Sequence, residues 1–191
     1  TLSGGPTVEL AWAPVDAPLM QIGAITANLL GSVAFHEWMT QALESATIYS
    51  WAQNNHWHTN YKADQPGLTS FRYVVRPHAG GYSASAAARF GLEQSRPLLV
   101  ALADESRPAA GSLLTVSSPG VLVETVKASD DGKGMIVRLF GVSGEEERVE
   151  LVWGVFKPTR VWLTDLTEKP LAPAGATLTV PGYGMVSLRA E

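Results

Sequence analysis

The sequence predicts an all-β protein, an antiparallel β-sandwich with one or two short helices. Short runs rich in Val, Ile, Thr and aromatic residues recur at intervals of about ten residues, as is typical of sandwiches. Gly, Pro, Asn and Asp separate these runs, and all four favour turns. Hydrophobic residues make up 46% of the 191 residues, which excludes a disordered chain and suffices for one ordinary domain or two small ones.

The first half of the chain carries the shorter predicted strands. We expect them over residues 7–12, within 19–30, and over 47–52, 69–76 and 98–102. The first should end before Pro14 and the fourth at Pro77, because proline has no N–H to donate to a sheet. The fifth is a continuous apolar run that follows Pro97.

The second half predicts its strands more clearly. Residues 121–126 and 135–142 are β-branched runs on either side of Asp130-Asp131-Gly132. An Asp-Gly pair indicates a hairpin here, because glycine accepts the positive φ of a tight turn. Val149, Leu151 and Trp153 alternate about Glu150, which indicates a strand with one buried face. Further strands are expected over residues 161–163, 177–180 and 185–188.

Two segments interrupt the β pattern, and a third stretch is a predicted turn. The Ala-rich run over residues 83–90 predicts a short helix with Ser83 as its N-cap. Residues 35–45 are compatible with a second helix, because their large apolar residues recur near helical spacing. The Gly-Glu-Glu-Glu stretch at 144–147 is expected to be a solvated hairpin turn.

Composition excludes several functional classes. The net charge is −4, so a basic footprint for nucleic acid is absent. No apolar stretch approaches the ~18 residues that a membrane helix needs. The absence of cysteine excludes disulfides, thiol nucleophiles and Cys-ligated zinc, and it leaves the compartment unknown. Because residues 1–5 contain no initiator Met and no secretion signal, we expect part of a longer polypeptide.

Two catalytic motifs are incomplete. His36-Glu37-Trp38-Met39-Thr40 begins like a zinc-protease helix, but Thr40 stands where the second histidine is required. The stretch Gly81-Tyr82-Ser83-Ala84-Ser85 resembles a nucleophile elbow, but Ser85 replaces the closing glycine. Neither stretch therefore predicts an active site.

The segment over residues 51–64 is the candidate binding site, because it concentrates amides beside aromatic rings. Asn55 and Asn60 offer donors and acceptors to sugar hydroxyls. Trp57 and Tyr61 offer rings that can cover the apolar face of a pyranose. We therefore interpret these four residues as candidates that face a carbohydrate.

Two other interpretations of this segment remain open. His56 and His58 share one face of a strand and would make a metal pair with Asp64, although closed metal sites usually have more ligands. Alternatively the asparagines form a turn, Trp57 packs in a core and the histidines satisfy backbone groups.

Several motifs resemble one known family. Asp16-Ala17-Pro18-Leu19, the stretch Asn54 to Tyr61, Phe71-Arg72-Tyr73 and Arg76-Pro77-His78 resemble the C-terminal region of glycoside hydrolase family 38, the α-mannosidases. Val126-Lys127, residues 136–140 and residues 164–168 look like the closing β-domain of that family. Residues 35–45 match nothing in it and are expected to be an insertion.

The resemblance implies that residues 1–191 are the C-terminal β-sandwich region, of the galactose-mutarotase-like supersandwich type, with a subdivision near 105–120. Family members are retaining exo-mannosidases whose catalytic carboxylates and zinc lie in an N-terminal barrel. That barrel, in the same polypeptide, is the implied partner, and an α-mannoside glycan is the implied ligand. No catalytic residue and no metal ligand carry over to this chain, so we expect no cofactor in it and no activity from it alone.

Two functions follow. In the first, the chain is a non-catalytic domain that packs on the barrel, with Asn55, Trp57, Asn60 and Tyr61 lining the sugar site. In the second, it is an autonomous carbohydrate-binding module that presents Trp57, Tyr61 and Tyr82 to solvent. The exposed side chains distinguish the two functions. A binding module presents aromatic residues to solvent, whereas a docking domain presents a broad apolar patch.

Overall fold

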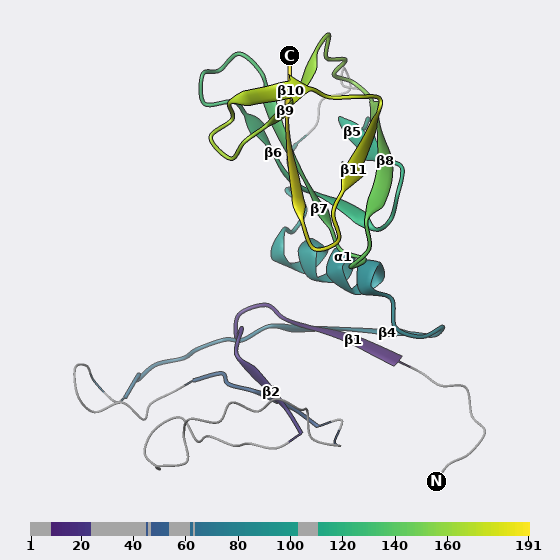
Figure 1. Cartoon of the computed structure of the whole chain (residues 1–191). Helices are drawn as coiled ribbons and strands as arrows, with labels where there is room; N and C mark the ends of the chain where they lie inside the picture. Colours follow the sequence, from purple (N-terminus) through teal and green to yellow (C-terminus); the bar gives the residue numbers. More distant parts are fainter. Residues whose placement is uncertain (1–8, 24–44, 46, 54–61, 63, 103–110) are drawn as a thin grey trace, which may run out of the picture. The chain divides into compact units, whose positions relative to one another are not determined.

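The computed structural model describes residues 9–23, 45, 47–53, 62, 64–102 and 111–191 (Figure 1). The chain forms two compact units, Thr1–Gly80 and Gly81–Glu191. Below they are called the first unit and the sandwich unit. The expected subdivision near 105–120 stays a prediction, since much of that stretch lies outside the described residues.

The first unit contains two antiparallel strand pairs. Strand β1 (Glu9–Pro14) pairs with β4 (Tyr73–His78), and β2 (Met20–Ile22) pairs with β3 (Ile48–Ser50). These strands lie within or overlap four of the predicted runs, although β2 and β3 have only three residues each.

Proline does not end β1 or β4 as the sequence analysis expected. Pro14 pairs with Tyr73 in the ladder, and Pro77 pairs with Leu10. Strands β1 and β4 form a two-stranded sheet, so each has one edge without a described partner. A proline can direct its substituted nitrogen to such an edge without the loss of a hydrogen bond. The expectation that both strands stop at proline was therefore wrong.

The sandwich unit stacks a five-stranded sheet, of order β10-β9-β12-β7-β6, on a three-stranded sheet of order β11-β8-β5. All strand pairs within the two sheets are antiparallel. The bounds are β5 (Leu114–Val116), β6 (Val121–Ala128), β7 (Met135–Gly141), β8 (Glu147–Trp153), β9 (Val161–Thr164), β10 (Pro170–Pro173), β11 (Thr177–Val180) and β12 (Met185–Ala190). This arrangement confirms the all-β sandwich.

The core lies between the two sheets. Val137, Leu139 and Leu188 contribute from the large sheet, and Val149 and Val180 contribute from the small one. All five are fully buried. The predicted alternation in β8 is confirmed, because Leu151 and Trp153 pack against the same core as Val149. Each such side chain contributes about 1.5 to 3 kcal/mol by leaving water.

One α-helix occurs among the described residues, α1 (Ala84–Ser95). The Ser83 Oγ accepts a hydrogen bond from the Ala86 N–H at 3.3 Å, which confirms Ser83 as the N-cap. The helix continues five residues beyond the predicted end at 90, and Phe90 is its buried residue. The second expected helix, over 35–45, lies outside the described residues except for Ser45. No helix among the described residues is long and apolar enough to cross a membrane.

The predicted hairpin between β6 and β7 is confirmed. Gly132 has φ 69°, and the Ser129 N–H donates to the Gly134 carbonyl at 2.8 Å. The turn at 144–147 joins β7 to β8, although Glu147 already belongs to β8 and its carboxylate accepts from the Ser118 hydroxyl at 3.0 Å. The run 98–102 is not a strand in this structure.

Candidate functional site

The four predicted carbohydrate-facing residues, Asn55, Trp57, Asn60 and Tyr61, lie outside the described residues. Their chain neighbours on both sides are described. Strand β3 leads into the segment and ends at Ser50, and β4 leaves it and begins at Tyr73. Described residues on both sides of this segment make the contacts that hold its two ends.

An aromatic pair and a hydroxyl contact join these ends. The Ser50 Oγ and the Tyr73 Oη lie 2.9 Å apart, within hydrogen-bond distance. The Tyr73 ring stacks on Trp12 of β1, with ring centroids 5.7 Å apart and an interplanar angle of 6°. Strands β1, β3 and β4 thus meet at one tyrosine, which is 39% exposed.

A bidentate ion pair makes a second connection. The Arg72 Nε and Nη2 donate to the two carboxylate oxygens of Asp16, each at 2.9 Å. The Arg72 backbone N–H donates to the same carboxylate at 2.8 Å. The side-chain hydrogen bond from Arg72 is the main reason that the pKa of Asp16 lies below its ordinary value. The pKa of Arg72 is raised for the same reason.

We call these two contacts, Ser50–Tyr73 and Asp16–Arg72, the clamp. Bidentate pairs fix geometry as well as charge, and the clamp holds residues 50 and 72–73 in defined positions. Asp16, Arg72 and Tyr73 belong to the motifs that resemble family 38, but no sequence pattern pairs Asp16 with Arg72. Trp12 and Ser50 carried no sequence signal for this site at all.

Among the described residues, no three His, Asp or Glu side chains come together in a way that could hold a metal ion. His56 and His58 of the alternative metal pair lie outside the described residues. The third member, Asp64, pairs with the Lys62 Nζ at 3.1 Å on an exposed surface.

The carboxylate of Asp165 caps its own turn. It accepts from the Thr167 hydroxyl at 2.7 Å and from the Lys169 N–H at 3.0 Å. The Thr167 hydrogen bond is the largest of the contacts that lower its pKa. An aspartate held ionised by its own loop is a turn residue, so Asp165 is a poor candidate for a general acid.

The sandwich unit has its own charged network, at the end of the large sheet. The Lys127 Nζ lies 2.5 Å from both Asp130 Oδ1 and Glu168 Oε1. The Glu168 carboxylate also accepts from the Asp130 N–H at 2.8 Å. Glu168 is only 6% exposed. This network connects the β6–β7 hairpin to the loop between β9 and β10.

A second part of the network involves Arg189 of β12. Its Nη2 donates to Asp131 Oδ2 at 2.8 Å, and its Nε donates to Glu191 Oε1 at 2.7 Å. Together with the Ser129 hydroxyl and the Lys133 N–H, the Arg189 guanidinium holds the pKa of Asp131 well below its usual range. The network is saturated with internal partners, which indicates a structural rather than a ligand-binding role.

Comparison with known proteins identifies the sandwich. Residues 120–188 match the model of the glycosyl hydrolases family 38 C-terminal beta sandwich domain. This match covers less than half of the chain. A human protein, alpha-mannosidase 2C1, is 31% identical over 114 residues. That alignment covers 57% of this chain and 11% of the relative, so the chain spans only a small part of the relative's length.

The resemblance to family 38 is thereby confirmed for the sandwich. Strands β6 to β12 lie within or overlap the matched residues. Lys127 and Glu168 of the network also lie within them. The clamp and the segment 54–61 precede the matched residues. Their assignment to a sugar site therefore belongs to the proposal below.

Proposed function

We propose that this chain is a non-catalytic part of a longer, family 38 α-mannosidase-like glycosyl hydrolase. In this proposal it packs on the catalytic part of the same polypeptide, and Asn55, Trp57, Asn60 and Tyr61 line the site of an α-mannoside. The observation that carries the proposal is the match of residues 120–188, which contain or overlap seven of the eight strands of the two-sheet sandwich, to the family 38 C-terminal domain.

The described carboxylates support a non-catalytic role. A retaining glycosidase uses two carboxyl groups about 5 Å apart, one on each side of the scissile bond. Asp64 pairs with an exposed lysine, and Asp165 caps its own turn. Catalysis, and the zinc ion that the family resemblance implies, are assigned in this proposal to the rest of the polypeptide.

Exposed apolar side chains on the first unit support a docking role. Leu10, Leu19 and Val75 are 57%, 65% and 50% exposed. Large exposed apolar side chains that recur on one small unit are typical of a surface that is covered in the complete protein. The catalytic part of the same polypeptide is the proposed cover.

The clamp supports a positioning role for the segment between its two ends. Groups that orient a sugar act best when the surrounding scaffold holds them in place, because a small misplacement weakens transition-state binding. The clamp fixes residues 50 and 72–73, and therefore limits where the intervening chain can run. Asn55 and Asn60 are then proposed to orient hydroxyls, and Trp57 and Tyr61 to cover the sugar ring.

The test compares hydrolysis of a chromogenic α-mannoside by this chain and by the full-length polypeptide with added zinc. We expect turnover only in the full-length protein, and turnover by the chain alone would overturn the non-catalytic assignment. In the full-length protein, Asn55→Ala should lower kcat/KM about tenfold, the effect of one lost hydrogen bond of about 1.4 kcal/mol. Gln53→Ala, at an exposed neighbouring amide, is the matched control. Equal activity of the two variants would refute the sugar-facing role.

An autonomous carbohydrate-binding module is the second candidate, favoured by the 82% exposure of Tyr82. Titration of the isolated chain with mannosides, followed by tryptophan fluorescence, separates the two proposals. Saturable binding that Tyr82→Ala abolishes would support the module. Binding that appears only in the full-length protein would support the docking domain.

A further inference from the structure

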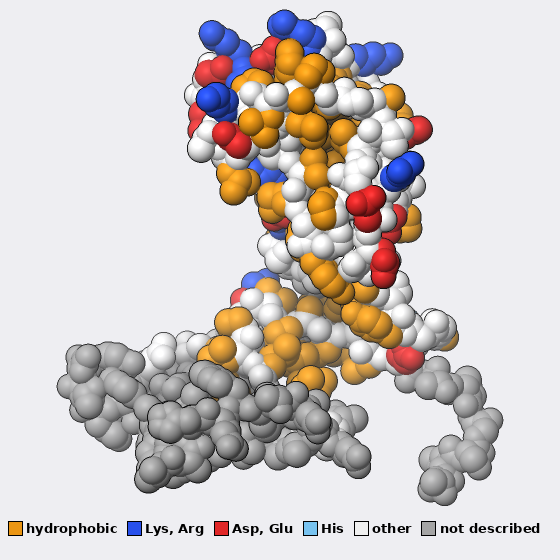
Figure 2. Space-filling model, viewed as in Figure 1, with side chains coloured by type: hydrophobic (Ala, Val, Ile, Leu, Met, Phe, Trp, Pro, Cys, Tyr) orange, Lys and Arg blue, Asp and Glu red, His pale blue; other side chains and the backbone are white. Residues whose placement is uncertain are grey.

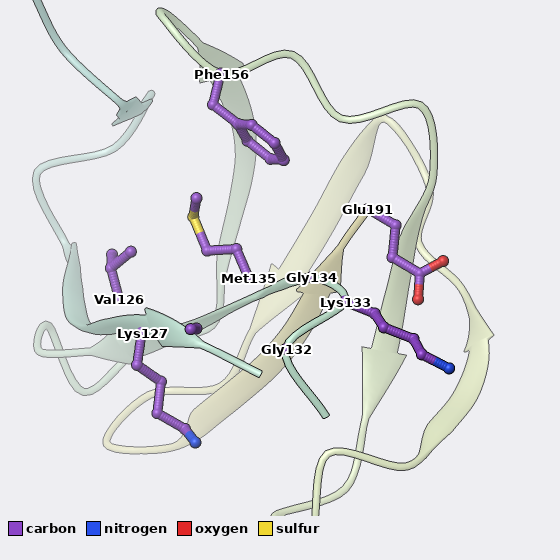
Figure 3. A pocket seen from close by; sticks show the side chains of 9 residues that line it. Val126, Lys127, Gly132, Lys133, Gly134, Met135, Phe156 and Glu191 are labelled. Atoms are coloured by element: carbon purple, nitrogen blue, oxygen red, sulfur yellow. The ribbon is translucent and has the colours of Figure 1, made fainter. Parts of the chain in front are cut away.

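A hollow opens at the end of the sandwich where β6 ends and β7 begins. Its volume is about 540 Å³. Val126, Met135 and Phe156 supply its apolar side chains, and Lys127, Lys133 and Glu191 stand around them (Figure 3). In Figure 3 the Phe156 ring extends into the hollow from one side, and the Met135 and Val126 side chains lie on another. The hollow is thus an extension of the core that lacks a cover among the described residues.

The same unit exposes an apolar run. Leu98, Leu99, Val100 and Leu102 are each at least 95% exposed. Figure 2 also shows hydrophobic side chains at the surface of the sandwich unit, with charged groups gathered mainly toward one end. Four large apolar side chains within five successive positions are costly to leave in water. Burial of the run and of the hollow would each remove apolar surface from water.

Described residues on both sides of this run have contacts near the hollow. Arg96, two residues before Leu98, binds the backbone carbonyl and the carboxylate of Glu124 on β6. On the far side, the Ser112 carbonyl accepts from the Val155 N–H at 3.0 Å, next to Phe156. Since Val126 and Phe156 both line the hollow, Arg96 and Ser112 are each held close to its lining.

One edge of the large sheet has no described strand paired with it, although its Glu124 carbonyl accepts from Arg96. Strand β6 is the last strand in the order β10-β9-β12-β7-β6, so no described strand pairs with its outer edge. Five extended residues span about 17 Å, which is enough to run from beside Glu124 past the end of β6. In an extended run Leu98, Val100 and Leu102 share one face, and Leu99 and Ala101 share the other.

We propose that residues 98–102 form a strap that lies along the free edge of β6 and closes the hollow. The strap runs parallel to β6, and Leu98, Val100 and Leu102 enter the hollow against Val126, Met135 and Phe156. The strap completes the core of the sandwich with a segment of the same unit. This inference does not depend on the proposed glycosidase function.

The absence of cysteine makes a direct cross-linking test possible, because any disulfide in an engineered variant joins the two introduced residues. The variant Val100→Cys/Val126→Cys should form a disulfide readily under mild oxidation. The control Val100→Cys/Val152→Cys should not, since Val152 is 62% exposed and alternates with the core-facing residues of β8. Oxidised and reduced protein are resolved by non-reducing electrophoresis and by mass spectrometry of the joined peptides.

A second pair of variants tests the same point without a cross-link. Leu98→Ser removes a side chain that the strap places in the hollow, and Leu99→Ser makes the same change on the opposite face. We expect Leu98→Ser to lower Tm by several degrees and to increase hydrogen exchange in residues 98–102, and Leu99→Ser to leave both unchanged. Equal effects of the two variants, or equal cross-linking of the two cysteine pairs, would overturn the strap and leave the run free for another surface.

Discussion

Truncation of one core side chain tests the sandwich quantitatively. Leu139 of β7 is fully buried between the two sheets and belongs to the cluster that joins them. Leu139→Ala should lower the free energy of unfolding of the sandwich unit by about 2 to 5 kcal/mol, because the transfer energy of the lost methyl groups adds to the cost of the cavity. A domain of this size has a total stability of about 5 to 15 kcal/mol, so the loss is a large share of it.

The assay is urea unfolding followed by circular dichroism. With an m-value of about 2 kcal/mol/M, a loss of 3 kcal/mol moves the midpoint down by about 1.5 M. Leu166→Ala is the matched control, because Leu166 is 70% exposed in the turn after β9. Its midpoint should stay within about 0.3 M, which corresponds to the ±0.5 kcal/mol of ordinary surface changes. The reasoning is refuted if the two variants shift the midpoint equally.

Three further predictions follow from the contacts described. The pKa of Asp131 is lowered in the folded protein, so its contribution to stability is present above pH 4, its ordinary pKa range, and is lost as pH falls below it. Asp131→Asn should therefore destabilise at pH 7, and urea titrations should show its difference from the wild type shrinking as the pH is lowered from 4 toward 2. Ser83→Ala should cost about 0.5 to 2 kcal/mol, the range for a lost N-cap, and should speed amide exchange in the first turn of α1. Asp16→Asn removes the charge that faces Arg72, so trypsin should cleave the first unit faster, and an unchanged cleavage rate would contradict the clamp.

The elements of the sandwich unit that could be predicted from sequence have local causes. The Asp130–Gly134 stretch, the alternation around Val149 and the Ser83 cap each act within a few residues. Strand β10 (Pro170–Pro173) could not be predicted in this way, because two prolines argue against a strand unless it lies at an edge. Its edge position depends on pairing with β9, which only the tertiary structure reveals.

The candidate site was less predictable than the fold. Asp16 and Arg72 are 56 residues apart in sequence, and Ser50 and Tyr73 are 23 apart. No periodicity connects such positions, so composition identified only the aromatic and amide-rich segment between them. The prediction for Asn55, Trp57, Asn60 and Tyr61 stays a prediction for that reason.

Glu168 has an unfavourable backbone conformation and a buried charge, so its contacts must compensate for both. It has φ 68°, which is unusual for a residue other than glycine, and its side chain is almost fully buried. The carboxylate offsets this by accepting from the Asp130 N–H and by facing the Lys127 ammonium. Through these contacts the β9–β10 loop is joined to the end of β6, at opposite edges of the five-stranded sheet.

A double-mutant cycle measures whether this connection stabilises the sheet. Glu168→Gln and Lys127→Met should each lower Tm, and the double variant should lose less than the sum of the two. Lys127→Met leaves the buried Glu168 carboxylate without its cation, whereas Glu168→Gln removes one of the two carboxylates that face Lys127. Glu146→Gln, at an exposed glutamate in the β7–β8 turn, controls for the loss of one negative charge. Strict additivity of Glu168→Gln and Lys127→Met would show that the two groups do not couple. In that case the positive φ of Glu168 would have to be explained by the turn alone.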